Sequence, residues 1–194
     1  MAEKIPPRLV WAAARLDFEK DARLLEIGCG NGVLAGLLCT RLDGGRLTAI
    51  DRSEKAVASA TKRNADHIAA GRAAFFTAAL ADAGSDGAAP ADAAPGGPGF
   101  GAQCFDKILA VNVNVFWIDP RRELETVKRL LKPGATLELF YEPPGAEQAE
   151  KIARLLHEKI SAGGFEILAR SAEPLGAAVG VHIAARPVRS RVTG

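Results

Sequence analysis

The spacing of apolar residues along the chain changes repeatedly between two periods. Short, nearly continuous apolar runs indicate buried strands, and longer stretches with apolar residues three or four apart indicate amphipathic helices. The predicted strands cover residues 23–27, 46–50, 73–78, 104–111, 135–141, 165–170 and 179–185. The predicted helices cover residues 8–18, 33–42, 53–69, 120–131 and 146–162.

Helices that separate successive strands predict right-handed βαβ units and a parallel sheet covered on both faces. We therefore expect an α/β fold, in which residues 1–194 form a single doubly wound, Rossmann-like domain. Its sheet should have seven strands and be mostly parallel. The last two predicted strands follow one another closely, so we expect the last strand to be antiparallel.

Capping and stop residues mark several predicted helix ends. Ser53 is a plausible N-cap for the helix that follows it. Asp119 should cap the helix in which Pro120 takes the first position. Lys132-Pro133-Gly134 should stop that helix, and Gly163-Gly164 should end the helix over residues 146–162.

Two segments lack the large apolar residues that packing requires. Residues 82–101 are mostly Ala, Gly, Pro and Asp, which predicts a flexible surface loop. The alternative is a lid over a functional site. We expect the tail, residues 187–194, to be frayed, because chain ends are seldom held in place.

Composition excludes several classes of partner and location. The formal net charge is +2 and the basic residues form no stripe, so we expect neither nucleic acid nor a membrane as partner. The first residues lack the apolar core of a signal peptide, and no apolar run is long enough to cross a bilayer. Three cysteines without a CxxC pair predict no disulfide framework and no metal site, and free thiols fit a cytoplasmic protein.

The most informative stretch is LLEIGCGNG, residues 24–32, which follows a predicted strand and opens a helix. Its glycines, Gly28, Gly30 and Gly32, allow a tight turn and let a ligand approach the backbone closely. Asp51 follows the next strand directly, about 20 residues further on, and is placed to accept hydrogen bonds from both hydroxyls of a ribose. Alternatively, the glycines form only a strand–helix turn and Asp51 only caps the helix after it.

Two features favour S-adenosylmethionine over a dinucleotide as the nucleoside ligand. A dinucleotide site prefers G-x-G-x-x-G/A, but Val33 occupies its third glycine position. Glu26 lies two residues before Gly28, where a carboxylate would repel a pyrophosphate and attract the cationic amine of a methionine.

Four motifs in this order resemble those of class I S-adenosylmethionine-dependent methyltransferases. They are LLEIGCGNG at residues 24–32, TAID ending at Asp51, FDKILAVN ending at Asn112, and LLKPG at residues 130–134. The resemblance implies that this protein transfers a methyl group from S-adenosylmethionine, its cofactor. The acid that family members often carry after the third strand is absent or displaced to Asp82, so this part of the match is incomplete.

The resemblance also implies cofactor contacts at individual positions. The backbones of Gly28, Cys29 and Gly30 would contact the methionine half, and Asn31 and Gly32 complete the loop. Glu26 would orient the amine with help from the carbonyl of Asn112. Asp51 would hold the ribose. Arg52, Leu80 and Asp82 would surround the adenine.

Catalysis and the acceptor are less well determined by the sequence. Glu142, at the carboxyl end of the strand over residues 135–141, is the best candidate for a general base. His67 and His157 should lie on solvated helix faces, and His182 should be structural. Residues 112–117 should form an apolar wall near the methyl group or pack in the core. The short chain favours a small-molecule acceptor. The alternatives are a non-catalytic S-adenosylmethionine-binding protein and, less favoured, an NAD-dependent oxidoreductase.

Overall fold

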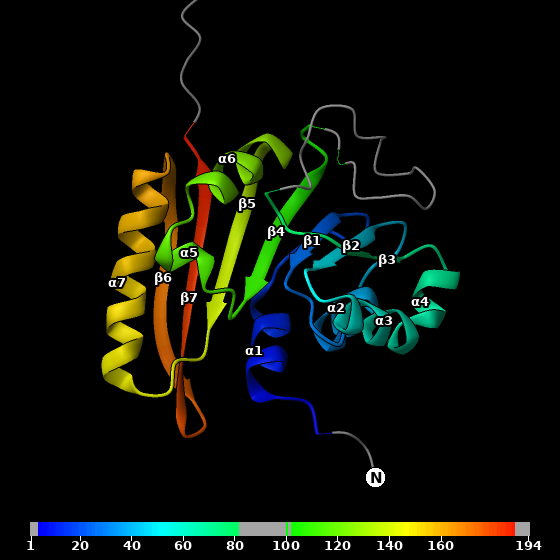
Figure 1. Ribbon diagram of the computed structural model, residues 1–194, viewed down its shortest axis with the longest axis horizontal. Helices are drawn as coiled ribbons and strands as arrows, with labels where there is room; N and C mark the ends of the chain where they lie inside the picture. Colours follow the sequence, from blue (N-terminus) through cyan, green and yellow to red (C-terminus); the bar gives the residue numbers. More distant parts are fainter. Residues whose placement is uncertain (1–3, 82–99, 101, 189–194) are drawn as a thin grey trace, which may run out of the picture.

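The computed structural model describes residues 4–81, 100 and 102–188. Seven strands form one sheet in the order β3-β2-β1-β4-β5-β7-β6 (Figure 1). The strands are β1 (Arg23–Ile27), β2 (Arg46–Asp51), β3 (Ala73–Thr77), β4 (Phe105–Val111), β5 (Leu131–Tyr141), β6 (Phe165–Leu175) and β7 (Ala178–Pro187). The first five pair in parallel, and β7 runs antiparallel to both β5 and β6. The predicted doubly wound sheet with an antiparallel last strand is confirmed.

Helices cover the sheet on both faces. They are α1 (Pro7–Arg15), α2 (Val33–Cys39), α3 (Glu54–Arg63), α4 (Ala65–Ala69), α5 (Val115–Ile118), α6 (Arg121–Leu130) and α7 (Ala146–Ala162). One core lies between the sheet and α5, α6 and α7, and the other between the sheet and α1, α2 and α3. Adjacent residues of β1 belong to different cores, since Leu24 faces one and Leu25 the other. Within the described residues, no helix is both long and apolar enough to span a bilayer.

The first helix is shorter than predicted. It ends at Arg15, and Leu16 is extended with a ψ of 117°. Arg41 donates from its guanidinium to the carbonyls of Ala13 (2.6 Å) and Leu16 (2.7 Å), and the same group lies over the ring of Phe18. Because a distant side chain satisfies these terminal carbonyls, the chain can leave the helix three residues before the predicted end at Phe18.

The predicted helix over residues 53–69 is broken at Asn64. Ser53 caps α3 as predicted, and its hydroxyl accepts from the amide of Ala56 (3.2 Å). The backbone of Asn64 is not helical, with φ of −106° and ψ of 24°, and its side chain is buried. The break therefore gives two helices, α3 and α4, with a buried polar side chain between them.

The chain after β4 also differs from prediction. A short helix, α5, follows Asn114 where only an apolar wall was expected. Asp119 does not cap α6; Pro120 occupies the cap position, and Asp119 instead binds Arg121 through both carboxylate oxygens (2.9 and 3.0 Å). Because Arg121 binds both oxygens of the Asp119 carboxylate, this side chain does not cap the amino end of α6.

The two segments predicted to be loosely held fall mostly outside the described residues. Of residues 82–101, only Phe100 is described, and it is buried edge-on against Phe105 with 5.3 Å between ring centroids. The expectation that nothing in this segment packs is therefore wrong at Phe100. The first residues of the tail predicted to be frayed are instead held in place, because β7 includes Pro187 and the amide of Val188 donates to the carbonyl of Gly164 (2.9 Å); residues 189–194 lie outside the described residues.

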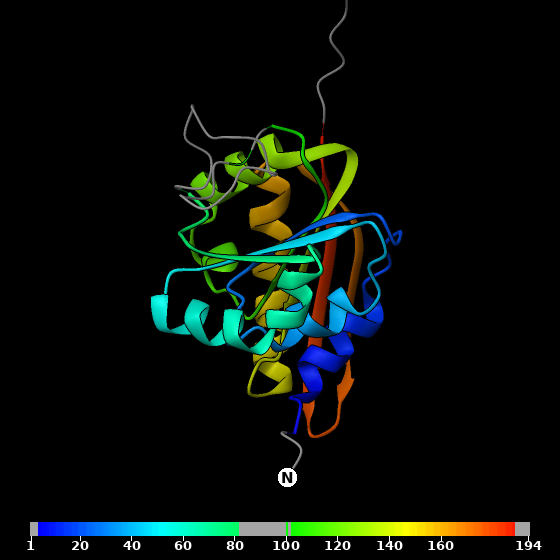
Figure 2. The same cartoon turned by 90° about the vertical axis from the view of Figure 1, so that its right-hand side faces the viewer.

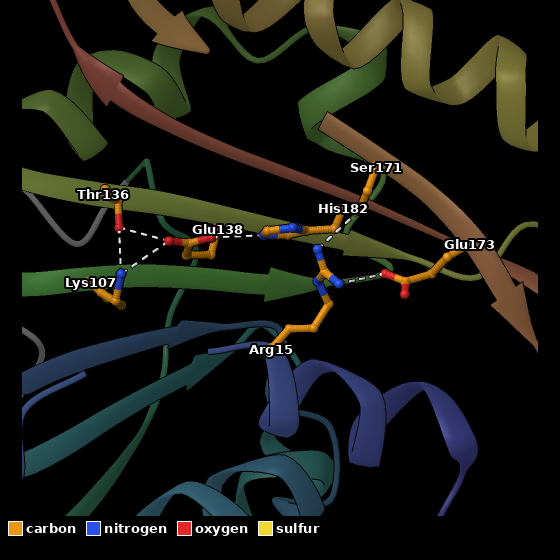
Figure 3. A network of polar contacts seen from close by, with 7 residues as sticks. All are labelled: Arg15, Lys107, Thr136, Glu138, Ser171, Glu173 and His182. Carbon is orange, nitrogen blue, oxygen red and sulfur yellow. Dashed lines mark hydrogen bonds and ion pairs between the residues drawn. The ribbon is translucent and has the colours of Figure 1, made fainter. Parts of the chain in front are cut away.

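A buried polar network joins β4, β5 and β7 (Figure 3). Lys107 donates to Glu138 (3.1 Å) and to Thr136 (2.9 Å), and His182 lies 2.8 Å from the other oxygen of Glu138. Burial alone would raise the pKa of Glu138, but the hydrogen bond from His182 and the charge of Lys107 outweigh it and hold this pKa below its ordinary value. The structural role expected for His182 fits this arrangement.

This network supports the docking of α1 (Figures 1 and 2). The ring of His182 stacks on Phe140 at a centroid distance of 4.6 Å, and Trp11 of α1 meets Phe140 edge-on at 5.3 Å. A Cβ atom at Gly180 would lie 2.9 Å from the Trp11 ring, so only glycine lets the indole approach β7 this closely. Arg15 adds an ion pair to Glu173 of β6 (2.9 Å).

We predict that E138Q lowers the free energy of unfolding by about 2 kcal/mol at neutral pH, because Lys107 loses its ionised partner. The depressed pKa means that the Glu138 carboxylate stabilises the fold above its ordinary value of 4.5 and stops doing so as the pH falls through the lower pKa of the folded state. Urea denaturation should therefore show the difference between wild type and E138Q shrinking in acid. The control is E166Q, which removes the exposed pair with Arg186. Equal losses in both variants would contradict the prediction.

Candidate functional site

The glycine loop lies where the carboxyl ends of β1 and β2 meet. Gly28, Gly30 and Gly32 all have positive φ, at 73°, 53° and 75°. The amides of Gly28 and Cys29 both donate to the carbonyl of Ile50 at the end of β2 (2.8 and 3.1 Å). The loop therefore folds back across the neighbouring strand, as the motif predicts for a ligand-binding turn.

Asn64, in the break between α3 and α4, holds the loop through a contact that was not predicted from the sequence. Its amide nitrogen donates to the carbonyls of Gly32 (3.0 Å) and Ala60 (2.9 Å). A Cβ atom at Gly32 would lie 2.6 Å from that nitrogen, so the third glycine makes room for the contact. The available signal was an asparagine inside a predicted helix, a position that this residue disfavours.

Glu26 lies buried on β1 beneath this loop. Its Oε2 atom has no hydrogen-bond partner among the residues that the structure describes. Burial and, secondarily, the negative charge of Asp51 raise the pKa of Glu26 to about 8. A buried carboxyl group without a partner is costly to the fold and is typical of a functional position.

Asp51 connects the loop to the start of α3. Its Oδ2 accepts from the amide of Gly30 (2.9 Å), and its Oδ1 accepts from the amide of Ser53 (2.9 Å). Ser53, not Asp51, is the N-cap of α3. Each carboxylate oxygen keeps a further lone pair for a ligand, so the predicted contact with a ribose is compatible with both bonds and stays a prediction.

A cleft of about 590 Å³ lies beside these groups. Its walls include five of the predicted cofactor residues, namely Gly28, Asp51, Arg52, Leu80 and Asn112. The other predicted residues do not line it: Glu26, Cys29 and Gly32 are buried, Gly30 is half-buried, and Asn31 is exposed, with its carbonyl bound to Arg63 (3.0 Å). Asp82 lies outside the described residues.

Asn112 ends β4 at the rim of the cleft. It is one of two described non-glycine residues with positive φ, at 56°. Its side-chain oxygen accepts from the amide of Glu142 (2.8 Å), which joins the ends of β4 and β5. The carboxylate of Glu142 itself forms an ion pair with Arg8 of α1 (3.2 Å). The structure therefore gives the predicted base a partner of its own within the protein.

A second cavity, of about 410 Å³, shares Asn112 and Asn114 with the cleft. It lies between α5, the end of β5 and one face of α7. Its walls also include Trp117, Tyr141, Glu142, Pro143, Pro144, Gln148, Lys151, Ile152 and Leu155. Residues 112–117 were expected either to form an apolar wall or to pack in the core. Asn112, Asn114 and Trp117 line this cavity, whereas Phe116 is buried in the core. The contribution of α7 was not predicted from the sequence.

Several solved structures share the fold of this protein. No curated protein matches the sequence. The structure is similar to the [4+2]-cyclase SpnF, at 19% identity with a TM-score of 0.68, over 93% of this chain and 81% of that one. It is also similar to a geranyl diphosphate methyltransferase in complex with SAM, at 10% identity with a TM-score of 0.67, over 93% and 84% of the chains. A SAM-dependent methyltransferase from Aquifex aeolicus matches at 17% identity with a TM-score of 0.63, over 92% and 88%.

The sequence identities to these structures are too low to transfer a function, so the similarities support the fold alone. The model of the methyltransferase domain family, in contrast, matches the sequence itself over residues 25–137, which include the glycine loop, Asp51 and Asn112. The chain therefore belongs to the methyltransferase domain family.

Proposed function

We propose that this protein transfers a methyl group from S-adenosylmethionine to a small-molecule acceptor. The observation that carries the proposal is the buried, partnerless oxygen of Glu26 beneath a positive-φ glycine loop, with Asp51 on the adjacent strand and an open cleft beside both. A carboxyl group at this position can ionise and pair with the ammonium group of a methionine, whereas it offers a pyrophosphate no cation with which to pair.

The residues of the cleft fit the remaining parts of the cofactor. The backbone of Gly28 would lie along the methionine half, and Asp51 would accept from the ribose hydroxyls. Arg52 and Leu80 offer a charged and an apolar side chain for the adenine. When bound, S-adenosylmethionine supplies a methyl group already activated by its sulfonium.

The contribution of the protein is mainly positioning. Because the leaving group is good, bringing a nucleophile into line with the methyl group accounts for much of the acceleration. An acceptor that must lose a proton would need a base, and Glu142 is the candidate at the rim of the second cavity. To act, its carboxylate would exchange the contact with Arg8 for one with the acceptor.

One alternative also has support. The similar fold of a [4+2]-cyclase indicates that this architecture is compatible with reactions other than methyl transfer. A protein that binds S-adenosylmethionine without transferring its methyl group would show cofactor binding and no methylated product with any acceptor. An NAD-dependent oxidoreductase is disfavoured by Glu26 and Val33 and would bind NAD in preference to S-adenosylmethionine.

We predict that D51A weakens binding of S-adenosylmethionine by about 10- to 100-fold, because the ribose loses a charged acceptor and Gly30 loses its hydrogen bond. Isothermal titration calorimetry measures the affinity. The matched control is S53A, which removes only the cap of α3 and should leave binding unchanged. Unchanged affinity in D51A, or binding of NAD alone by the wild type, would argue against the proposal.

We also predict that cofactor binding releases a proton. Below about pH 8 the free protein keeps Glu26 protonated, and pairing with an ammonium group favours the ionised form. The affinity for S-adenosylhomocysteine should therefore rise with pH between about 6 and 7.5, by up to about tenfold per unit. Calorimetry in buffers of different ionisation enthalpy counts the released protons. E26Q should bind more weakly and without this pH dependence, and proton release that persists in E26Q would contradict the assignment.

A further inference from the structure

The second cavity has the location and size of a site for a small molecule. It adjoins the cleft through Asn112 and Asn114. Residues of α5 and α7, two helices that lie side by side in Figure 1, contribute to its lining. Its volume of about 410 Å³ is near the lower end of small-ligand pockets, which start at about 300 Å³.

One face of α7 forms the far wall. Gln148, Lys151, Ile152 and Leu155 follow the spacing i, i+3, i+4 and i+7, so they lie along one side of the helix. The wall is polar at Gln148 and Lys151 and apolar at Ile152 and Leu155. Trp117 of α5 adds an aromatic surface opposite. The cavity is therefore amphipathic, with an apolar body and a polar end.

The hydrogen-bonding groups left over in this cavity are mostly donors. The side-chain oxygen of Asn112 is taken by the amide of Glu142 (2.8 Å), and that of Asn114 by the indole N–H of Trp117 (3.3 Å). Each asparagine keeps its NH₂ group for a ligand. The hydroxyl of Tyr141 already donates to the carbonyl of Val113. A ligand rich in acceptor oxygens is the complement of these groups.

The charges of the lining also favour a ligand with acceptor oxygens, and specifically an anionic one. Glu142 is the one carboxylate in the lining, and Arg8 neutralises it. Lys151 is the one cation there, and it forms no ion pair or hydrogen bond with the residues that the structure describes. Glu147, one turn earlier on α7, is exposed and makes no ion pair with Lys151. The net charge offered to a ligand is therefore positive.

We infer that the second cavity binds the methyl acceptor, and that this acceptor is a small organic acid whose carboxylate pairs with Lys151 while its apolar body packs on Trp117 and Ile152. The inference rests on the proposed function. The cavity can hold the acceptor only if the cleft, with which it shares Asn112 and Asn114, holds S-adenosylmethionine. Lys151 acts here as a specificity-determining residue.

The test uses three probes that share one apolar body, namely 4-phenylbutyrate, 4-phenylbutanol and 4-phenylbutylamine. Each is titrated into the full-length protein saturated with S-adenosylhomocysteine. We expect the acid to bind about tenfold more tightly than the alcohol, because a charge-assisted pair is worth more than a neutral contact. The amine should bind most weakly. K151M should reduce the affinity for the acid to that for the alcohol and leave the alcohol unaffected.

The matched control is K159M, on the same helix but outside the cavity lining, which should bind the acid like the wild type. Equal binding of the three probes, no binding of any of them, or the same loss in K151M and K159M would overturn the inference. Titration with S-adenosylhomocysteine alone comes first. Failure there would contradict the proposed function, whereas cofactor binding without a preference for the acid would reject only this inference.

Discussion

The glycine loop after β1 keeps its shape because groups from three other positions hold its backbone. The carbonyl of Ile50 accepts from its first two amides, Asp51 accepts from Gly30, and Asn64 donates to the carbonyl of Gly32. These contacts fix the loop above Glu26, whose carboxyl group is thereby removed from water. The raised pKa of Glu26 and the open cleft in front of the loop both depend on this one arrangement.

The sequence predicts correctly those helices and strands whose ends are determined by neighbouring residues. The strand over residues 23–27 and the helix over residues 146–162 match the structure, because each is bounded by turn or glycine residues in the sequence itself. The errors occur where distant side chains intervene. Arg41 binds the terminal carbonyls of α1 from the turn after α2, and Asn64 departs from helical geometry and binds the glycine loop. A pattern of apolar spacing contains no information on such partners.

The same distinction applies to the site. The glycine spacing placed Gly28 and Asp51 at one cleft, because the carboxyl ends of parallel strands meet at one edge of the sheet. Asn112, which lines the same cleft, was expected there from the resemblance to the methyltransferase family. The second cavity combines residues from α5, β5 and α7, and only the folded chain brings these together. Likewise, Arg8 lies 134 residues from Glu142 in the sequence, so no motif could have revealed the pairing of the candidate base.

The docking of α1 has a consequence for the order in which the domain is completed. Trp11 packs against Phe140 and beside Gly180, and Arg15 binds Glu173, so the partners of this early helix belong to strands made much later. During synthesis α1 leaves the ribosome before β5, β6 and β7, so Trp11 and Arg15 lack these partners until the strands follow. Such contacts between the two extremities give the domain a high contact order and favour slow, all-or-none closure over stepwise growth from the amino end.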